Sequence, residues 1–423
     1  MIVRRLLLIF CVLAPSAMAA GQGMAMQMGG PAGTVTSDVL RHSGSGTDLE
    51  PGAAAPPMLM RMTANDWMLM LHGVAFAAEQ QQTGPRGDDK FFSVNWLMPM
   101  AQRDIGRGQL TLRAMISLEP ATITGRYFPE LFQQGETAFG KPIVDGQHPH
   151  NFFMEIAGIW DQRLGKKGLL TFYAAPVGDP ALGPVAYPHR ASASEDPLAT
   201  LGHHLEDSTH ISYDVVTLGL TAGGKRGARL EASGFHGREP DENRWHMQAG
   251  AIDSWSARLS VVPDAHWVAQ YSLGRLHSPE ALHPEEDILR QTASVDCHYG
   301  SATKLDASAV WGRNHTVGEA QNANAYLLEA TVHLGERQSV WTRIENADRT
   351  SDLLKAAAPA AETVIGRVQA YTAGYAHSLW DGKLGAAEVG AQATGYVTPA
   401  RLVAEYGAHP WGVAAFVRLQ LGK

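Results

Sequence analysis

Residues 253–274 read DSWSARLSVVPDAHWVAQYSLG, and both faces of two successive strands can be followed in this stretch. Every second residue from Trp255 to Val261 is apolar, with Ser or Arg between them, and the same spacing returns from Trp267 to Leu273. Strict alternation is the pattern of a β-strand with one apolar and one polar face, because successive side chains leave opposite sides of the backbone. The stretch therefore predicts a β-hairpin with its turn at Pro263–Asp264.

Similar hairpins recur almost to the end of the chain. About sixteen strand candidates of roughly 9–13 residues follow from Asp66 onward, the length of tilted strands that cross a bilayer. We expect strands at 66–78, 91–101, 109–118, 148–160, 168–176, 210–221, 228–237, 253–262, 266–276, 288–299, 304–313, 325–335, 338–347, 366–378, 384–395 and 411–421. Short connections alternate with long ones. This predicts an all-β fold, a transmembrane antiparallel β-barrel of about 16 strands with short periplasmic turns and long extracellular loops.

The architecture over residues 66–423 resembles that of bacterial outer-membrane β-barrel proteins of porin type. The resemblance implies a location in the bacterial outer membrane and a channel for small polar or cationic solutes. The partners it implies are outer-membrane lipid, the outer-membrane assembly machinery and small solutes, with a homotrimer left open. The alternative fold is a soluble β-sandwich, barrel or propeller. Small and branched residues on the apolar face, with Trp and Tyr near the strand ends, favour contact with lipid.

Composition and the N-terminus limit the other classes of function. The chain has 423 residues, of which 45% are hydrophobic and 18% charged, and its formal charge of −8 without a Lys/Arg cluster argues against nucleic acid as a partner. Arg4 and Arg5 precede an apolar run and a small-x-small pattern, which predicts a signal peptide over 1–19. Its removal changes the charge from −8 to −10, since it takes away two arginines. Cys297 is then the one cysteine left, so no intramolecular disulfide is expected.

Residues 20–64 are rich in Gly, Ala, Pro and Ser, and we expect a flexible, Met-containing periplasmic tail there. The long segment 119–147 is too apolar for a freely solvated loop, so it is expected to fold into the barrel mouth, or else to cap the outside rim.

The polar face of the strand candidates is expected to line the lumen, where charges of both signs can be hydrated and paired. The predicted pore-lining residues are Arg113, Glu231, Arg258, Arg290, Asp296, Glu329, Arg343, Glu388 and Arg418.

The histidines and methionines indicate a second candidate function, which is the binding of a metal, copper, in metal tolerance or efflux. The chain has 18 histidines, and imidazole with nearby carboxylate suits Cu(II), Zn or Ni, while thioethers are soft ligands that prefer Cu(I) or Ag(I). The candidate metal ligands are Met24, Met26, Met28, Met58, Met60, Met62, His148, His150, His203, His204 and His210. The Met/His content of the N-terminal region resembles that of copper-resistance outer-membrane proteins of the B type. A resident cofactor is otherwise not expected, and loop packing is the alternative role for these histidines.

A hydrolase is the third class. Ser208 and His210, with Asp207 or Asp214, include the residue types of a nucleophile, a base and an orienting acid. Their crowding in sequence argues against a triad, and the chain has no Gly-x-Ser-x-Gly elbow. We therefore predict that the protein is not an enzyme, with no catalytic residues.

Overall fold

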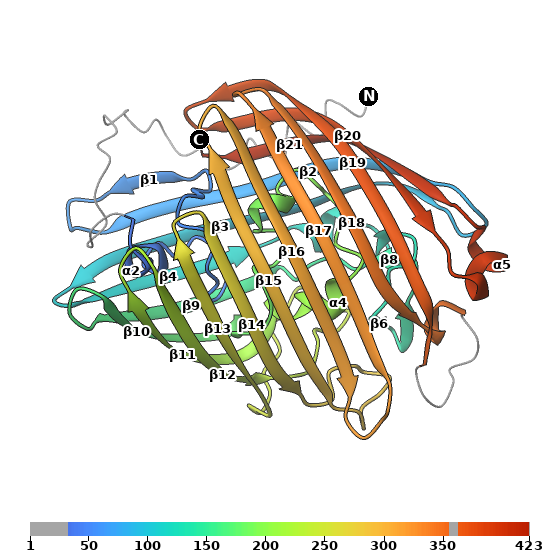
Figure 1. Cartoon of the computed structure of the whole chain (residues 1–423), viewed down its shortest axis with the longest axis horizontal. Helices are drawn as coiled ribbons and strands as arrows, with labels where there is room; N and C mark the ends of the chain where they lie inside the picture. Colours follow the sequence, from blue (N-terminus) through green and yellow to red (C-terminus); the bar gives the residue numbers. More distant parts are fainter. Residues whose placement is uncertain (1–32, 355–362, 423) are drawn as a thin grey trace.

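The computed structural model describes residues 33–354 and 363–422, and their wall is a closed antiparallel β-barrel of 16 strands (Figure 1). The wall strands are β2 (Met68–Gln82), β3 (Asp89–Ile105), β4 (Gly108–Ile116), β9 (Phe153–Arg163), β10 (Gly168–Gly178), β11 (Ser212–Gly223), β12 (Gly227–His236), β13 (Ser254–Asp264), β14 (Trp267–Leu276), β15 (Ile288–Gly300), β16 (Thr303–Thr316), β17 (Asn322–Leu334), β18 (Gln338–Thr350), β19 (Val364–Gly382), β20 (Gly385–Val397) and β21 (Trp411–Leu421). Each strand pairs with its sequence neighbour, and β21 closes the ring on β2. The predicted fold class is thereby confirmed, and each of the sixteen strand candidates overlaps one wall strand.

The remaining elements are short. They are α2 (Val35–Val39), β1 (Leu59–Met62), α3 (Glu119–Thr122), β5 (Phe128–Pro129), β6 (Glu136–Ala138), β7 (Lys141–Ile143), β8 (Gly146–Gln147), α4 (His203–Glu206), α5 (Val403–Tyr406) and the 3-10 turns η2 (Ala191–Ala193), η3 (Ser208–His210), η4 (Ser351–Leu354) and η5 (Ala400–Leu402). Among the described residues, none of the helices has the length and apolar character needed to cross a membrane.

The hairpin of β13 and β14 shows how the register sorts the side chains. Leu259 lies opposite Tyr271 and both face outward, each about 45% exposed, whereas Arg258 lies opposite Ser272 and both are buried inside. The turn itself falls at residues 265–266 and not at Pro263–Asp264, because Asp264 still pairs with Trp267 across a bulge. Pro263–Asp264 is a dipeptide typical of turns, yet the pairing of β13 with β14 continues through it.

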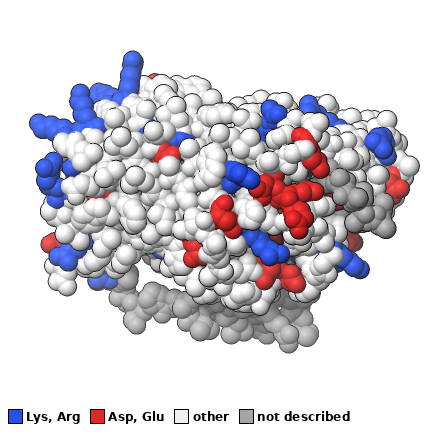
Figure 2. Space-filling view, turned by 90° about the horizontal axis from the view of Figure 1, so that it is seen from below, with Lys and Arg blue, Asp and Glu red and all other residues white. Residues whose placement is uncertain are grey.

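The outer wall is apolar. Leu218, Leu230 and Leu328 are among many large apolar side chains that stay exposed on it. Figure 2 shows a broad belt of the surface with few Lys, Arg, Asp or Glu residues, and charged side chains gathered toward the two ends. An apolar belt with polar ends matches the hydrocarbon and headgroup layers of a bilayer.

The interior is filled by three segments of the chain itself. The N-terminal segment, residues 33–57, enters from the end with the short turns, where Val35 N–H donates to Gly224 O and Ala53 N–H donates to Ala265 O. The first inward loop, residues 117–152, and the second inward loop, residues 179–211, enter from the other end. Most residues of all three segments are buried.

Two expectations for these segments have different outcomes. The fold of 119–147 into the barrel is confirmed, since its Phe128 packs with Leu198 of the second inward loop and its Phe132 with Tyr396 of the wall. The flexible tail over 20–64 is wrong for residues 33–62, because 33–57 is held in the lumen and β1 pairs with β2. Composition alone could not show that strand side chains offer this Gly-rich stretch its hydrogen-bond partners. Residues 1–19 and 20–32 lie outside the described residues.

Candidate functional site: a filled lumen and a histidine cluster

All nine predicted pore-lining residues face the interior of the barrel. Eight of them are less than 9% exposed, and Glu388 is partly buried beside Arg418. Charged side chains around an open, water-filled pore would be accessible to water, so their burial means that the chain's own segments occupy the lumen. Whether these residues line a conducting pathway stays a prediction.

Arg113 of β4 is the first anchor of the N-terminal segment. Its guanidinium donates to the carbonyl oxygens of His42, Gly44 and Gly46 at 3.0, 2.6 and 2.5 Å. The same group pairs with Glu155 at 2.7 Å, and Glu155 Oε1 also accepts from Gly46 N–H at 3.1 Å. A buried charge pair is stable only when its remaining lone pairs and protons are satisfied, and the segment's backbone supplies those partners.

Arg258 of β13 is the second anchor. It pairs with Glu231 of β12 at 3.0 Å and with Asp48 of the segment, and it donates to Thr47 Oγ1 at 3.1 Å. The wall thus holds the segment through two arginines, each already paired with a glutamate of a neighbouring strand. Two of the predicted pore-lining residues, Arg113 and Arg258, are therefore structural partners of the segment in this conformation.

The second inward loop is anchored in a similar way. Glu329 of β17 accepts from Arg190 of the loop at 2.6 Å and from Arg343 of β18 at 3.1 Å. Arg343 also pairs with Asp196 of the loop at 3.1 Å and donates to Leu198 O at 3.1 Å. These contacts tie the loop to one side of the barrel wall.

The buried charge of the interior is acidic. Eighteen buried Asp and Glu residues stand against nine buried Arg among the described residues, and none of the buried residues there is a lysine. Unpaired carboxylates in a low dielectric require protons or cations.

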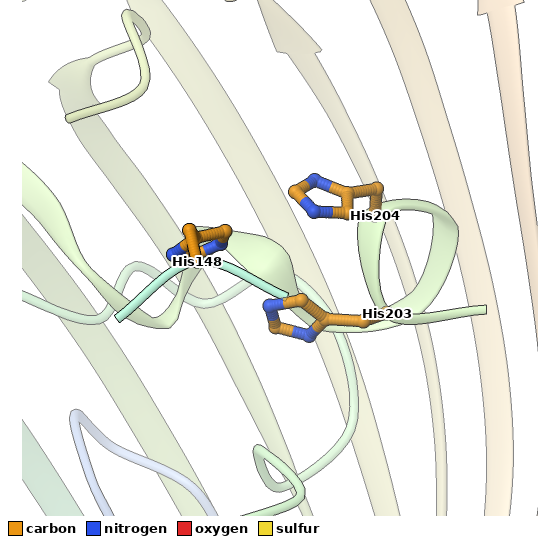
Figure 3. Close-up of side chains that lie close together, drawn as sticks. All are labelled: His148, His203 and His204. Atoms are coloured by element: carbon orange, nitrogen blue, oxygen red, sulfur yellow. The ribbon is translucent and has the colours of Figure 1, made fainter. Parts of the chain in front are cut away.

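The two inward loops bring the five predicted histidine ligands together. His148 and His150 lie just before β9, His203 and His204 lie on α4, and His210 ends η3. The ring centroids of His148 and His204 are 5.7 Å apart, and those of His150 and His210 are 5.3 Å apart. Figure 3 shows the rings of His148, His203 and His204 arranged around a shared space.

Two carboxylates complete this cluster. Ligand atoms of His148, His203 and His204 lie within 4.8 Å of one another, and so do those of Glu136, His204 and Glu239. Together they line a small cavity of about 20 Å³, which is the space of one or two water molecules or a single ion. Glu136 already pairs with His148 and with Arg244, so an ion here would share that carboxylate with the arginine.

Burial sets the protonation of the cluster. It lowers the pKa of His148 and His203 and lowers that of His204 to about 3, which favours their neutral forms. Both nitrogens of His148 face oxygen atoms, Nδ1 the Pro149 carbonyl at 3.1 Å and Nε2 the Glu136 carboxylate, so a metal ion at His148 would replace one of these contacts. Burial, with the nearby Glu136 carboxylate, raises the pKa of Glu239 to about 8. Three neutral imidazoles and two carboxyl groups form a donor set that suits Zn(II), Ni(II) or Cu(II). The residues present fit a transition-metal dication.

The predicted methionine ligands that the structure describes stand apart from this cluster. Met60 and Met62 on β1 are exposed, Met58 packs against a methionine cluster of the wall, and Met24, Met26 and Met28 lie outside the described residues. Glu136 and Glu239 could not be identified from the sequence, because they come from loops without apolar periodicity. As metal ligands, the histidines and methionines named from the sequence stay predictions.

The described residues do not assemble the triad considered from the sequence. Asp207 accepts from His203 Nδ1 at 2.6 Å and not from His210, whose Nδ1 faces the backbone oxygen of Asp207 at 2.8 Å. Ser208 Oγ accepts from Arg290 at 2.8 Å. His210 is thus not oriented by Asp207 as the base of a triad with Ser208 would be.

Comparison with known proteins identifies the fold. No protein-family model and no curated protein matches the chain, and the resemblance to copper-resistance proteins is not supported. An anion-selective porin from Comamonas acidovorans is similar in structure, with a TM-score of 0.52 and 11% identity over 84% of this chain and 99% of that one. OmpF of Salmonella typhi in complex with daunomycin gives a TM-score of 0.51 and 9% identity over 86% and 100% of the two chains. The chain therefore has the barrel fold of porins.

Proposed function

We propose that this protein is a porin-like channel of the bacterial outer membrane for small polar or cationic solutes, and that its N-terminal segment closes the channel in this conformation. The porin fold and the apolar belt of the outer wall support the location. The observation that carries the proposal is the set of hydrogen bonds and the ion pair by which Arg113 and Arg258 hold residues 42–48. These contacts are polar and reversible, so the segment can leave while the wall strands stay paired.

The solute class rests on the sign of the interior charge. Buried carboxylates outnumber buried arginines two to one among the described residues, so release of the segment exposes an acidic passage. An acidic lumen concentrates cations and repels anions. Monovalent cations are the simplest solutes to test.

A reversible crosslink tests this function. Ser45 of the segment lies next to Asp179 of the second inward loop, with their side-chain oxygens 2.8 Å apart. We would join Ser45→Cys to Asp179→Cys with a reducible thiol crosslinker in a Cys297→Ser background, and record conductance in planar bilayers. We expect the crosslinked chain to be silent and reduction to restore cation-selective conductance. Equal conductance before and after reduction, with the single variant Ser45→Cys as control, would refute closure by the segment.

We propose metal binding, in tolerance or efflux, as a second candidate function, and the cluster of His148, His203, His204, Glu136 and Glu239 favours it. Titration of the purified protein with Zn(II), Ni(II) and Cu(II) by calorimetry tests it. The double variant His148→Ala/His204→Ala should lose the tight site. His246→Ala should keep it, because this histidine is exposed although it lies in the loop that carries Glu239. Binding that survives in the double variant would rule the cluster out.

A further inference from the structure

The inner wall carries a second group of soft donors, away from the histidine cluster. Met70, Met98, Met100, Met115 and Met154 form one contiguous buried cluster. These residues come from four neighbouring strands or the turns beside them: Met70 from β2, Met98 and Met100 from β3, Met115 from β4 and Met154 from β9. The inner face of the barrel is otherwise rich in Ser, Thr, Arg and Glu, so this patch stands out from its surroundings.

The register places these side chains in one row. His72 of β2 lies opposite Met98 of β3, and the pairings Leu97–Ile116 and Met100–Arg113 place Met98 opposite Met115 of β4. A bulge where β4 meets β9 brings Met154 next to Met115. The row therefore runs His72, Met98, Met115, Met154 across the wall at one level.

The second inward loop adds an imidazole to the row. His189 Nε2 lies 2.8 Å from Met115 Sδ, and its ring centroid is 6.3 Å from that of His72. Trp96 of β3 packs against both histidines, with centroid distances of 4.2 Å to His189 and 5.1 Å to His72. The second inward loop thus places His189 against Met115 and near His72, at the row of thioethers on the wall.

Two polar atoms in this group have no partner, His72 Nε2 and Trp96 Nε1. His72 is 3% exposed, and its Nε2 is buried without a hydrogen bond. A buried nitrogen without a partner costs free energy that a leucine or methionine at the same position would not cost. Simple packing does not account for the buried His72 Nε2, whereas an ion bound to this nitrogen would.

We propose that His72, Met98, Met115, Met154 and His189 form a binding site for a soft monovalent cation, Cu(I) or Ag(I). Thioether sulfur and imidazole nitrogen are the ligands that soft ions prefer. All five ligands are neutral, so a monovalent ion leaves less buried charge than a divalent one. The aromatic face of Trp96 borders the site and adds cation–π attraction. The site stands independently of the channel, and it differs in chemistry from the histidine and carboxylate cluster, which suits dications.

The test compares matched variants of the full mature chain in detergent. The triple variant Met98→Leu/Met115→Leu/Met154→Leu removes the thioethers with little change in volume. Met70→Leu/Met100→Leu is the control, because it alters the same buried cluster outside the proposed ligand row. All variants retain Met24, Met26 and Met28, so Cu(I) binding by that run cancels in the comparison. Heat-modifiable migration verifies that each barrel is folded.

Cu(I) binding is measured by competition with a chromogenic chelator, and Ag(I) binding by quenching of Trp96 fluorescence relative to Trp96→Phe. We expect the triple variant to lose one tightly bound Cu(I) per chain and the Ag(I)-dependent quenching, and the control to keep both. A folded triple variant that binds Cu(I) like the unmodified protein would overturn the proposal. Should the triple variant fail to fold, His189→Ala in the loop gives the same comparison. Zn(II) titration of each variant reports separately on the histidine cluster.

Discussion

Replacing Gly46 by alanine should release the N-terminal segment from the lumen without touching the barrel wall. Gly46 has φ +52°, in the left-handed region, and its N–H and C=O both bond to the Arg113–Glu155 pair. A Cβ at this position would lie 2.6 Å from Asp179 O and 2.7 Å from Asp179 Cβ. The alanine variant therefore combines backbone strain with a clash against the second inward loop.

The expected effect follows from these two costs. A non-glycine residue in the left-handed region costs about 1–2 kcal/mol, and overpacking of a tight contact costs about 1–3 kcal/mol. Together they weaken docking of the segment by about 2–5 kcal/mol, so the ratio of docked to released segment falls roughly 30-fold to 4,000-fold. The matched control is Gly44→Ala, because its Cβ would meet Asp48 Cβ at 3.4 Å, an ordinary contact, and its φ is not left-handed.

Limited proteolysis with trypsin reads out the release. Arg41 lies in the segment between Leu40 and His42, which are 2% and 4% exposed, so cleavage after Arg41 requires the segment to leave the lumen. We expect Gly46→Ala to be cut much faster than the unmodified protein, and Gly44→Ala at close to the unmodified rate. If Gly46→Ala and Gly44→Ala are cut at the same slow rate, the segment is not held at this point and the reasoning fails.

Three further predictions follow from charge and exposure. Burial raises the pKa of Glu50 to about 8, with the Asp306 and Asp296 carboxylates adding to the effect, so docking keeps this carboxyl protonated. Because the released segment ionises near the ordinary value of 4.5, docking should weaken as pH rises from about 4.5 to 8, seen as faster cleavage after Arg41, and Glu50→Gln should reduce that slope. Arg343→Met leaves Glu329 and Asp196 short of a buried partner and should destabilise the barrel by about 3–5 kcal/mol, lowering the temperature of heat-modifiable conversion. The control is Arg367→Met, which removes the exposed partner of Asp348 and should leave that temperature nearly unchanged. On the outer wall, Leu328→Arg should lower the free energy of unfolding by about 2–4 kcal/mol and reduce folding into lipid vesicles. The control Leu334→Arg, at the strand end, should lower it by about 0–1 kcal/mol. Equal folding yields of the two variants would contradict a lipid-facing wall.

The barrel could be predicted from the sequence because its information is local. In a wall strand each side chain faces either lipid or lumen, so Trp255, Leu259 and Tyr271 alternate with Arg258 and Ser272 in a pattern of period two. The alternation of short and long connections then gives the antiparallel order. The error at Pro263–Asp264 is of the same local kind, since a bulge lets the strand continue through residues that resemble a turn.

The contents of the lumen could not be predicted in the same way. Residues 33–57 have no periodicity, and their position depends on Arg113 and Arg258, which are distant in sequence. The histidines were found by their composition, but Glu136 and Glu239 join them only through the folding of two separate loops. His189 meets Met115 for the same reason, because the loop between β10 and β11 folds inward and places His189 against β4. Such contacts depend on tertiary structure, and the period-two alternation of side chains along a strand does not encode them.

Single-channel recording of the full mature chain against a chain that lacks residues 33–57 tests most directly whether the protein closes its own barrel. Because the segment occupies the lumen at Arg113 and Arg258, the full chain should open rarely, and the shortened chain should show a stable, cation-selective open level. The same open level and open probability in both chains would contradict the account.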